Sequence, residues 1–251
     1  MIKFFRKIRQ KLLVENRFNK YLIYAIGEII LVVIGILIAL QINNWNESRK
    51  SEKRANEITE KLKVEIFEII NYLEFTNKGI EDQLSYLEKI LTSNEKNIDS
   101  ILPKTRYKLS PIFYLTSYSQ FFDPPSDVYA TAINDGSILL IKNKKLTREL
   151  QMFNKSIKLR LDEIIKEEYK QSREINDYIS SEYASFFKNK TITTDYNWDK
   201  EVTKDIILKL KNDGKIKYML VERIAFKKAR QRFILMYKND FETLLKEQNN
   251  D

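Results

Sequence analysis

Histidine and cysteine are both absent from the 251 residues, and each absence removes a large class of chemistry. Without thiols or imidazoles the chain cannot form disulfides, use thiol or imidazole catalysis, or build ordinary zinc, haem and iron–sulfur sites. A metal site would have to use carboxylates alone. The sequence therefore predicts no cofactor, no metal and no enzymatic activity.

Glycine and proline are scarce, with five glycines and four prolines in the whole chain. Phosphate-binding loops and dinucleotide folds need clustered glycines, so that the backbone can approach the ligand. No such cluster is present. Abundant Leu, Ile, Lys and Glu with so few glycines favour helices over hairpins, and the sequence predicts an all-α fold.

The net charge of +9 is concentrated at the N-terminus, where residues 1–20 contain seven Lys or Arg against one Glu. Both signs alternate through most of the remaining chain. A basic excess beside an apolar segment is typical of contact with a lipid bilayer. The charge distribution thus predicts the bilayer as a partner, and no nucleic acid.

The longest apolar run, Leu22 to Leu40, contains a single charge, Glu28. At 1.5 Å per residue it spans about 28 Å, the thickness of the hydrocarbon core. A cleaved signal peptide is the alternative, but the run is too long and residues 43–48 lack a small-x-small site. With Tyr21 and Trp45 as interfacial anchors, we predict a transmembrane helix at 21–43.

The flanking cations predict the topology. Seven Lys or Arg precede the apolar run and five follow it within a comparable distance, so the N-terminus is expected in the cytoplasm. Residues 1–20 then form a cytoplasmic basic amphipathic segment and 44–57 a polar helical stalk. Residues 58–251 form a periplasmic domain held at the inner membrane.

Glu28 shares one face of the predicted transmembrane helix with Tyr24, Gly35 and Ala39. Small residues four apart permit close helix approach, and intramembrane charges usually face a partner. The hypothesis is association through this face into a homo-oligomer or with another membrane protein, with Glu28 protonated or hydrogen-bonded. The alternative is a carboxyl group tolerated through a local water defect.

Beyond the stalk, apolar residues recur every three or four positions in three long segments, which predicts an elongated antiparallel helical bundle. Gly79 marks a kink, Asp123 and Asn143 are predicted N-caps, and Gly136 and Gly214 end helices. The predicted core stripes are Ile58, Leu62, Ile66, Ile69, Leu73, Ile80, Leu84, Leu87 and Leu91; Leu146, Leu150, Phe153, Ile157, Leu161 and Ile164; and Ile216, Met219, Phe226, Ala229, Phe233, Tyr237 and Leu244.

Two groups of charged residues are candidate sites. The carboxylates could hold a hard cation and the basic patch could bind phosphate, anionic lipid or an acidic partner, but interleaved charges on helices are typical of solvated faces. We therefore expect both groups to be solvated. They are Asp162, Glu163, Glu167 and Glu168, and Arg223, Lys227, Lys228, Arg230 and Arg232.

Aromatic residues gather in Ile112–Phe122, beside the proline cluster. They are a candidate partner or ligand surface because aromatic side chains give large contact areas. The alternative is a short helix that plugs the end of the bundle. The residues concerned are Phe113, Tyr114, Tyr118, Phe121 and Phe122.

The string YAIGEIILVVIGILIALQINNWNE, Tyr24–Glu47, closely resembles the start of an uncharacterised family of flavobacterial membrane proteins, defined only as a domain of unknown function. Residues 129–146 are similar to the helix–Gly–helix segment of that family. The resemblance implies a membrane location and a shared architecture, and it implies no activity.

The leading functional hypothesis is a membrane-anchored, non-enzymatic interaction or scaffold module of the cell envelope. One alternative is a sensory or ligand-binding domain that uses the aromatic region and signals through a partner. The other is an enzyme that uses carboxylates, hydroxyls and lysines, which is disfavoured because the usual acid–base and nucleophile constellations cannot be assembled.

Overall fold

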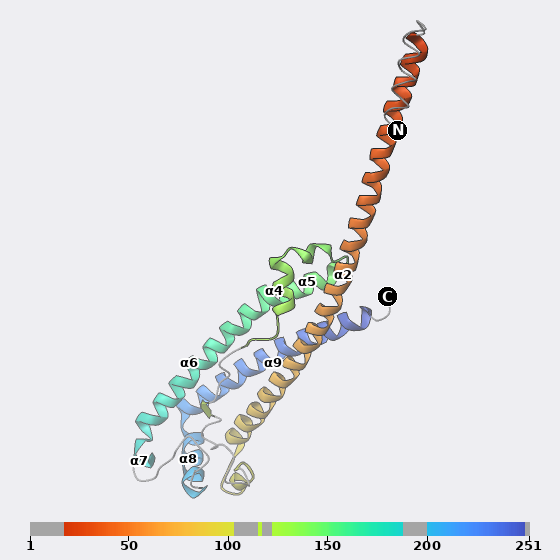
Figure 1. Ribbon diagram of the computed structural model, residues 1–251. Helices are drawn as coiled ribbons and strands as arrows, with labels where there is room; N and C mark the ends of the chain where they lie inside the picture. The colour runs from red at the N-terminus through yellow and green to blue at the C-terminus, as the bar shows by residue number, and fades with distance from the viewer. Residues whose placement is uncertain (1–17, 103–114, 117–121, 188–199, 249–251) are drawn as a thin grey trace. The chain divides into compact units, whose positions relative to one another are not determined.

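The computed structural model describes residues 18–102, 115–116, 122–187 and 200–248. It divides the chain into two compact units, Met1–Glu57 and Ile58–Asp251, and helix α2, Phe18–Thr92, contributes to both (Figure 1). The described residues are almost entirely helical and contain no strand. The predicted all-α fold is confirmed.

The helices after α2 are short near the middle of the chain and long toward its end. Their bounds are η1 Ile98–Ser100, α4 Asp127–Asn134, η2 Ser137–Leu140, α5 Lys144–Met152, the π-helical turn η3 Phe153–Ile157, α6 Lys158–Glu182, α7 Ala184–Phe187, α8 Lys200–Asn212 and α9 Gly214–Gln248.

The first unit consists, in its described part, of the N-terminal portion of α2. Side chains from Ile29 to Arg54 are exposed, including the whole apolar run from that point to Leu40. Among the described residues, α2 is the one helix whose length and composition would allow it to cross a membrane. After the apolar run the helix is polar, with Lys50 paired to Glu47 at 3.0 Å.

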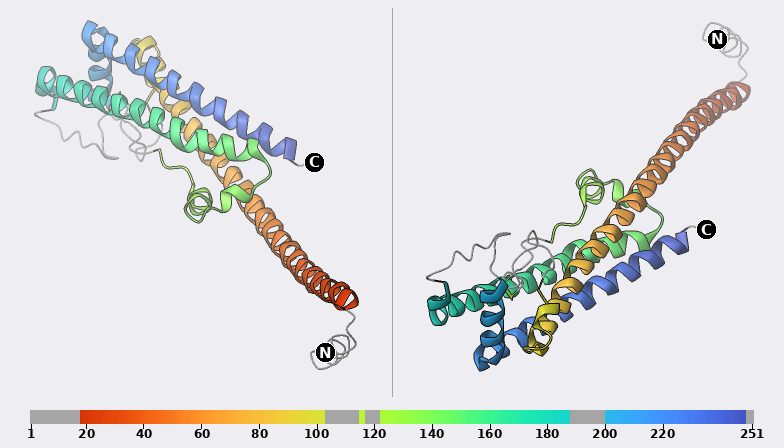
Figure 2. Two further views of the ribbon diagram at one scale, coloured as in Figure 1. Left: turned by 90° about the horizontal axis from the view of Figure 1, so that it is seen from above. Right: turned by 90° about the horizontal axis from the view of Figure 1, so that it is seen from below.

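The second unit is a helical bundle built on α2 from Ile58 onward, α6 and α9 (Figure 2). Ion pairs define the direction of α9. Lys228 pairs with Glu88 at 2.7 Å, whereas Lys238, farther along α9, pairs with Glu74, which lies earlier in α2. The two helices are therefore antiparallel, which confirms the elongated antiparallel bundle.

Helix α6 runs in the same direction as α2, because the segment that leads into α6 packs with the earlier part of α2 in the bundle and the end of α6 packs with the later part. One hydrophobic cluster joins Leu62 to Leu84 with Leu146 to Ile165, and a second joins Leu87 and Ile90 with Ile175 and Ile179. Helix α9 contributes its C-terminal half to the first cluster and its N-terminal end to the second.

Buried positions follow spacings of four and three residues along all three long helices, the pattern of coiled-coil packing. In α6 this pattern begins after the π-helical turn. The buried or half-buried positions are Leu62, Ile66, Ile69, Leu73, Thr76, Ile80, Gln83, Leu87 and Ile90 in α2; Leu161, Ile165, Glu168, Ser172, Ile175 and Ile179 in α6; and Ile216, Leu220, Arg223, Lys227, Arg230, Ile234, Tyr237, Phe241 and Leu244 in α9.

The predicted stripes differ from this core in three places. At the end of α2, Ile90 is buried and the predicted Leu91 is half-buried. Ile165 is buried and Ile164 is only half-buried, because the five-residue π-helical turn η3 alters the rotation of the helix before α6. In α9 the predicted Met219, Phe226, Ala229 and Phe233 are half-buried flanks of the core, and charged residues occupy the central positions between them.

Several predicted helix ends are confirmed. Asn143 caps α5, its side chain accepting a hydrogen bond from the Leu146 amide at 3.0 Å. Gly136 follows α4 with φ of 74°, a left-handed conformation that glycine adopts without strain. Helix α8 ends at Asn212. Gly79, where the sequence predicts a kink, does not interrupt the helix, because α2 continues through it.

The predicted cap at Asp123 is wrong, because α4 begins at Asp127. The side chain of Ser126, the residue at the N-cap, makes no capping bond. The capping acceptor comes instead from α2, where the buried Glu65 carboxylate accepts from the amides of Val128 at 2.7 Å and Tyr129 at 3.0 Å. Both amides belong to the first turn of α4, so a distant side chain supplies its cap.

Candidate functional site

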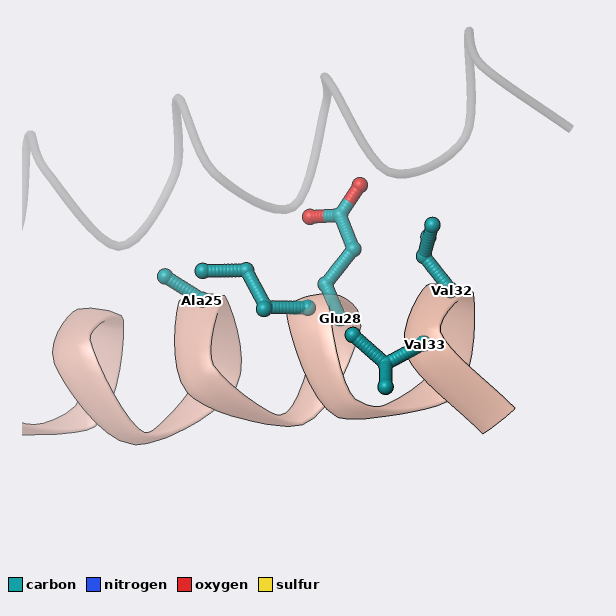
Figure 3. Close-up of a pocket in the computed structure, with 5 residues that line it drawn as sticks. Ala25, Glu28, Val32 and Val33 are labelled. Carbon is teal, nitrogen blue, oxygen red and sulfur yellow. The ribbon is translucent and has the colours of Figure 1, made fainter. Parts of the chain in front are cut away.

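Glu28 lies in the apolar part of α2, and Figure 3 shows its carboxylate pointing away from the helix axis. Ala25, Ile29, Val32 and Val33 line a surface hollow with it. Its side chain is half-buried, in contrast to the exposed residues that follow. The described residues that line the hollow are thus apolar apart from one carboxylate.

The other residues of the predicted association face remain a prediction. Gly35 and Ala39 are exposed, and a side chain at Gly35 would meet nothing within 4 Å. The side chains of Tyr24 and Tyr21 lie outside the described set. Trp45 is exposed, with the Arg49 guanidinium 6.0 Å from its ring centroid.

Most of the predicted aromatic surface, namely Phe113, Tyr114, Tyr118 and Phe121, lies outside the described residues. Phe122 is described, and it is buried. It packs edge-to-face against Tyr72 and Phe153, with ring centroids 5.5 and 6.3 Å away. Phe122 is therefore a core residue and offers no surface.

A group of charged side chains occupies the interior between the two hydrophobic clusters. We call Glu168 of α6 with Arg223, Lys227 and Arg230 of α9 the polar layer; all four are fully buried or 1% exposed. Lys227 Nζ lies 3.1 Å from Glu168 Oε2, and Arg230 Nη1 lies 3.5 Å from the same oxygen. One carboxylate oxygen thus serves two cations.

Two further contacts tie the polar layer to the surrounding helices. Arg223 Nη1 donates to the main-chain oxygen of Glu168 at 3.3 Å. Lys227 donates to the side-chain oxygen of Gln83 in α2. The layer therefore connects all three long helices.

Burial disturbs the protonation of the cations. Burial lowers the pKa of Lys227 to about 8, against the attraction of Glu168 and with added repulsion from Arg223 and Arg230. Burial likewise lowers the pKa of Arg223 to about 10, again against Glu168. The repulsion acting on Lys227 indicates that Arg223 and Arg230 each lie within electrostatic reach of its ammonium group.

The expectation of two solvated faces is wrong for these four residues. Glu168 is buried although Glu163 and Glu167 are exposed, and Lys228 and Arg232 alone of the basic patch are exposed. The rule that charged residues lie outside led to the error. The available signal was spacing, because the four-three pattern of Leu220 and Ile234 continues through the charged positions.

Asp213 organises the start of α9. Its Oδ1 accepts from the amides of Lys215 and Ile216, and its Oδ2 accepts from the hydroxyls of Tyr178 and Tyr183. Burial opposes its ionisation, but these bonds outweigh burial and lower the pKa of Asp213. It is a structural N-cap that joins α9 to the end of α6.

The carboxylates of α6 were expected to be solvated rather than to form a cation site. Within the described ranges, no group of three or more acidic side chains is arranged to hold a metal ion. Among the described residues, most of the buried charged side chains belong to the polar layer, and three of its four members are cations.

The sequence was compared with protein families, curated proteins and solved structures. The family of unknown function DUF6090 matches residues 28–209, most of the chain. The chain belongs to DUF6090. No curated protein and no solved structure matches it. The DUF6090 match begins at Glu28 and ends within α8, so it includes Glu168 but not the α9 cations.

Proposed function

We propose that this DUF6090 protein is a membrane-anchored, non-enzymatic interaction module, in which α2 fixes a helical bundle to the bilayer. The observation that carries the proposal is the exposure of the apolar run. From Ile29 to Leu40 every side chain of α2 is exposed, although most are Ile, Leu or Val. Such a surface is unfavourable in water and is favoured in lipid.

The composition supports a role without catalysis. The chain has no histidine and no cysteine, so the commonest acid–base and nucleophilic groups are missing. The described acidic side chains do not gather into a group. Binding and assembly remain the functions for which the chain is best equipped.

The bundle also has exposed apolar side chains. Val64, Phe67 and Phe75 are 60%, 57% and 80% exposed, and at 100° per residue they fall within one stripe of α2. Exposed aromatic residues on one stripe are typical of a surface that meets another protein. We propose a second copy of the chain as that protein, in keeping with self-association through the Glu28 face.

The proposed orientation places residues 1–20 in the cytoplasm and the bundle in the periplasm, in accordance with the excess of cations before the apolar run. The absence of cysteine makes this testable without background labelling. Single cysteines at Gln10 and at the exposed Ser180 would report the two sides of the membrane.

We expect the chain to stay in the membrane pellet after alkaline carbonate extraction. In spheroplasts, a membrane-impermeant maleimide should label Ser180→Cys at once and Gln10→Cys only after lysis. Recovery of the chain in the soluble fraction would refute the anchor. The reverse labelling pattern would refute the orientation and leave the anchor intact.

A further inference from the structure

The polar layer carries more positive than negative charge. Glu168 is its one carboxylate, and the other buried carboxylate of the described residues, Glu65, caps α4. Arg223, with a pKa of about 10, and Lys227, with a pKa of about 8, both remain largely charged at neutral pH. Lys227 and Arg230 share one carboxylate oxygen, and positive charge is costly in a poorly solvated interior, so additional negative charge beside them is favoured.

Arg230 shows where that charge would bind. Its Nη1 faces Glu168, but its Nε and Nη2 are buried and have no hydrogen-bond partner among the described residues. These two nitrogens form one edge of the planar guanidinium, and their N–H bonds point in parallel. This edge is the one that binds two oxygens of a carboxylate or phosphate group simultaneously.

The surrounding groups favour an anion over other ligands. Lys227 lies beside Arg230, since both contact Glu168 Oε2, and Arg223 acts electrostatically on Lys227. Glu168 is the opposing carboxylate, and its Oε1 also lacks a hydrogen-bond partner among the described residues. The three cations outnumber this carboxylate, so an oxyanion would improve the charge balance of the layer.

We propose that the polar layer is a binding site for a small oxyanion, a phosphate or carboxylate group, held in bidentate fashion by the Nε–Nη2 edge of Arg230. The neighbouring cations Lys227 and Arg223 add electrostatic attraction. The site lies wholly within the bundle, so this inference does not depend on the membrane anchor and can fail while the anchor holds.

The test uses the full chain in detergent, with inorganic phosphate and acetate as probes and sodium chloride at matched ionic strength as reference. Thermal unfolding is recorded against probe concentration. We expect a saturable rise in melting temperature, since a ligand that binds only the folded state stabilises it. Phosphate also stabilises proteins by exclusion from their surfaces, but that rise does not saturate.

Two variants separate the specific effect from the general one. Arg230→Lys keeps the charge and removes the paired donors, and it should bind the better probe at least about tenfold more weakly. Arg232→Lys makes the same change at an exposed position of α9 and should behave as the parent. Equal saturation curves in the parent and Arg230→Lys would overturn the proposal.

Isothermal titration of the parent keeps the test decisive should Arg230→Lys fail to fold. Saturable binding at one site per chain supports the proposal, and the tighter of phosphate and acetate identifies the class of ligand. Absence of saturable binding for both probes overturns it, and water would then satisfy the Arg230 donors.

Discussion

Lys227 differs from an ordinary lysine in its environment. Its ammonium group is fully buried between α2, α6 and α9. Glu168 of α6 attracts it, Arg223 and Arg230 of its own helix repel it, and the neutral Gln83 of α2 accepts its hydrogen bond. Burial is the largest of these influences and lowers its pKa to about 8. Folding therefore makes the ammonium group of Lys227 easier to deprotonate than it is in the unfolded chain.

This shift predicts how stability depends on pH. Between the folded pKa of about 8 and the ordinary lysine pKa of 10.5, the unfolded chain binds more protons at Lys227 than the folded chain does. The contribution of Lys227 to the free energy of unfolding should therefore rise with pH across this interval, by up to about 1.4 kcal/mol per pH unit. The slope becomes small only well below pH 8, where both the folded and the unfolded chain bind the proton.

Urea unfolding of the detergent-solubilised chain at pH 7 to 9 would measure the slope. The upper limit of pH 9 stays below the ordinary tyrosine pKa of 10.0, near which the tyrosines with raised pKa values in the fold would make stability fall as pH rises. Lys227→Met should remove the rise, and Lys228→Met, which changes an exposed neighbour, should keep it. An identical pH profile in the parent and Lys227→Met would contradict the prediction.

Helix α4 depends on a carboxylate that it does not contain. It has eight residues, too few to form alone, and its two first-turn amides donate to Glu65 of α2. Burial is the largest influence on Glu65 and raises its pKa, although the two amide bonds act in the opposite direction. The carboxylate thus fixes the position of α4 against α2.

Glu65→Gln should destabilise the chain by about 1–3 kcal/mol, because its NH2 group cannot accept the second amide bond and leaves a buried donor unpaired. Chemical unfolding would give the free energy, and hydrogen exchange by mass spectrometry should show faster exchange over 127–134.

Ser126→Ala is the matched control for Glu65→Gln. Ser126 occupies the N-cap position without making a side-chain cap bond, so its loss should change stability by less than about 0.5 kcal/mol. A larger effect of Ser126→Ala than of Glu65→Gln would show that α4 is capped locally.

The two units of the molecule treat apolar side chains differently. The first exposes them along a helix, and the second buries them in the core of a bundle. The proposed self-association uses the face of α2 that carries Glu28, Gly35 and Ala39. At 100° per residue, Leu37 points to the opposite side of the helix from Glu28 at nearly the same depth as Ala39. This pair provides a direct test of the face.

Ala39→Cys should form disulfide-linked dimers in oxidised membranes severalfold more efficiently than Leu37→Cys. Both start from a cysteine-free chain, so each dimer reports one position. Adding Glu28→Leu to Ala39→Cys should lower the yield, since a carboxyl group in lipid favours a partner that can hydrogen-bond to it. Equal yields at positions 37 and 39, or no effect of Glu28→Leu, would exclude the proposed face.

Periodicity in the sequence was sufficient to predict the helical class, the bundle and most apolar core positions of α2 and α5. Local chemistry predicted the cap at Asn143 and the left-handed residue Gly136, because both depend on neighbours within a few residues. The candidate aromatic surface could not be judged beyond Phe122, whose burial depends on Tyr72 and Phe153 from distant segments.

The amino-acid sequence by itself determined the apolar run, the absence of thiol and imidazole chemistry, and the helical fold, since each follows from composition or short-range spacing. Only the tertiary structure decided that Glu65 caps α4 and that Glu168, Arg223, Lys227 and Arg230 are buried together. Charged residues at core spacing look solvated in a sequence. Their burial is decided by oppositely charged and polar partners on other helices, which are more than fifty residues away along the chain.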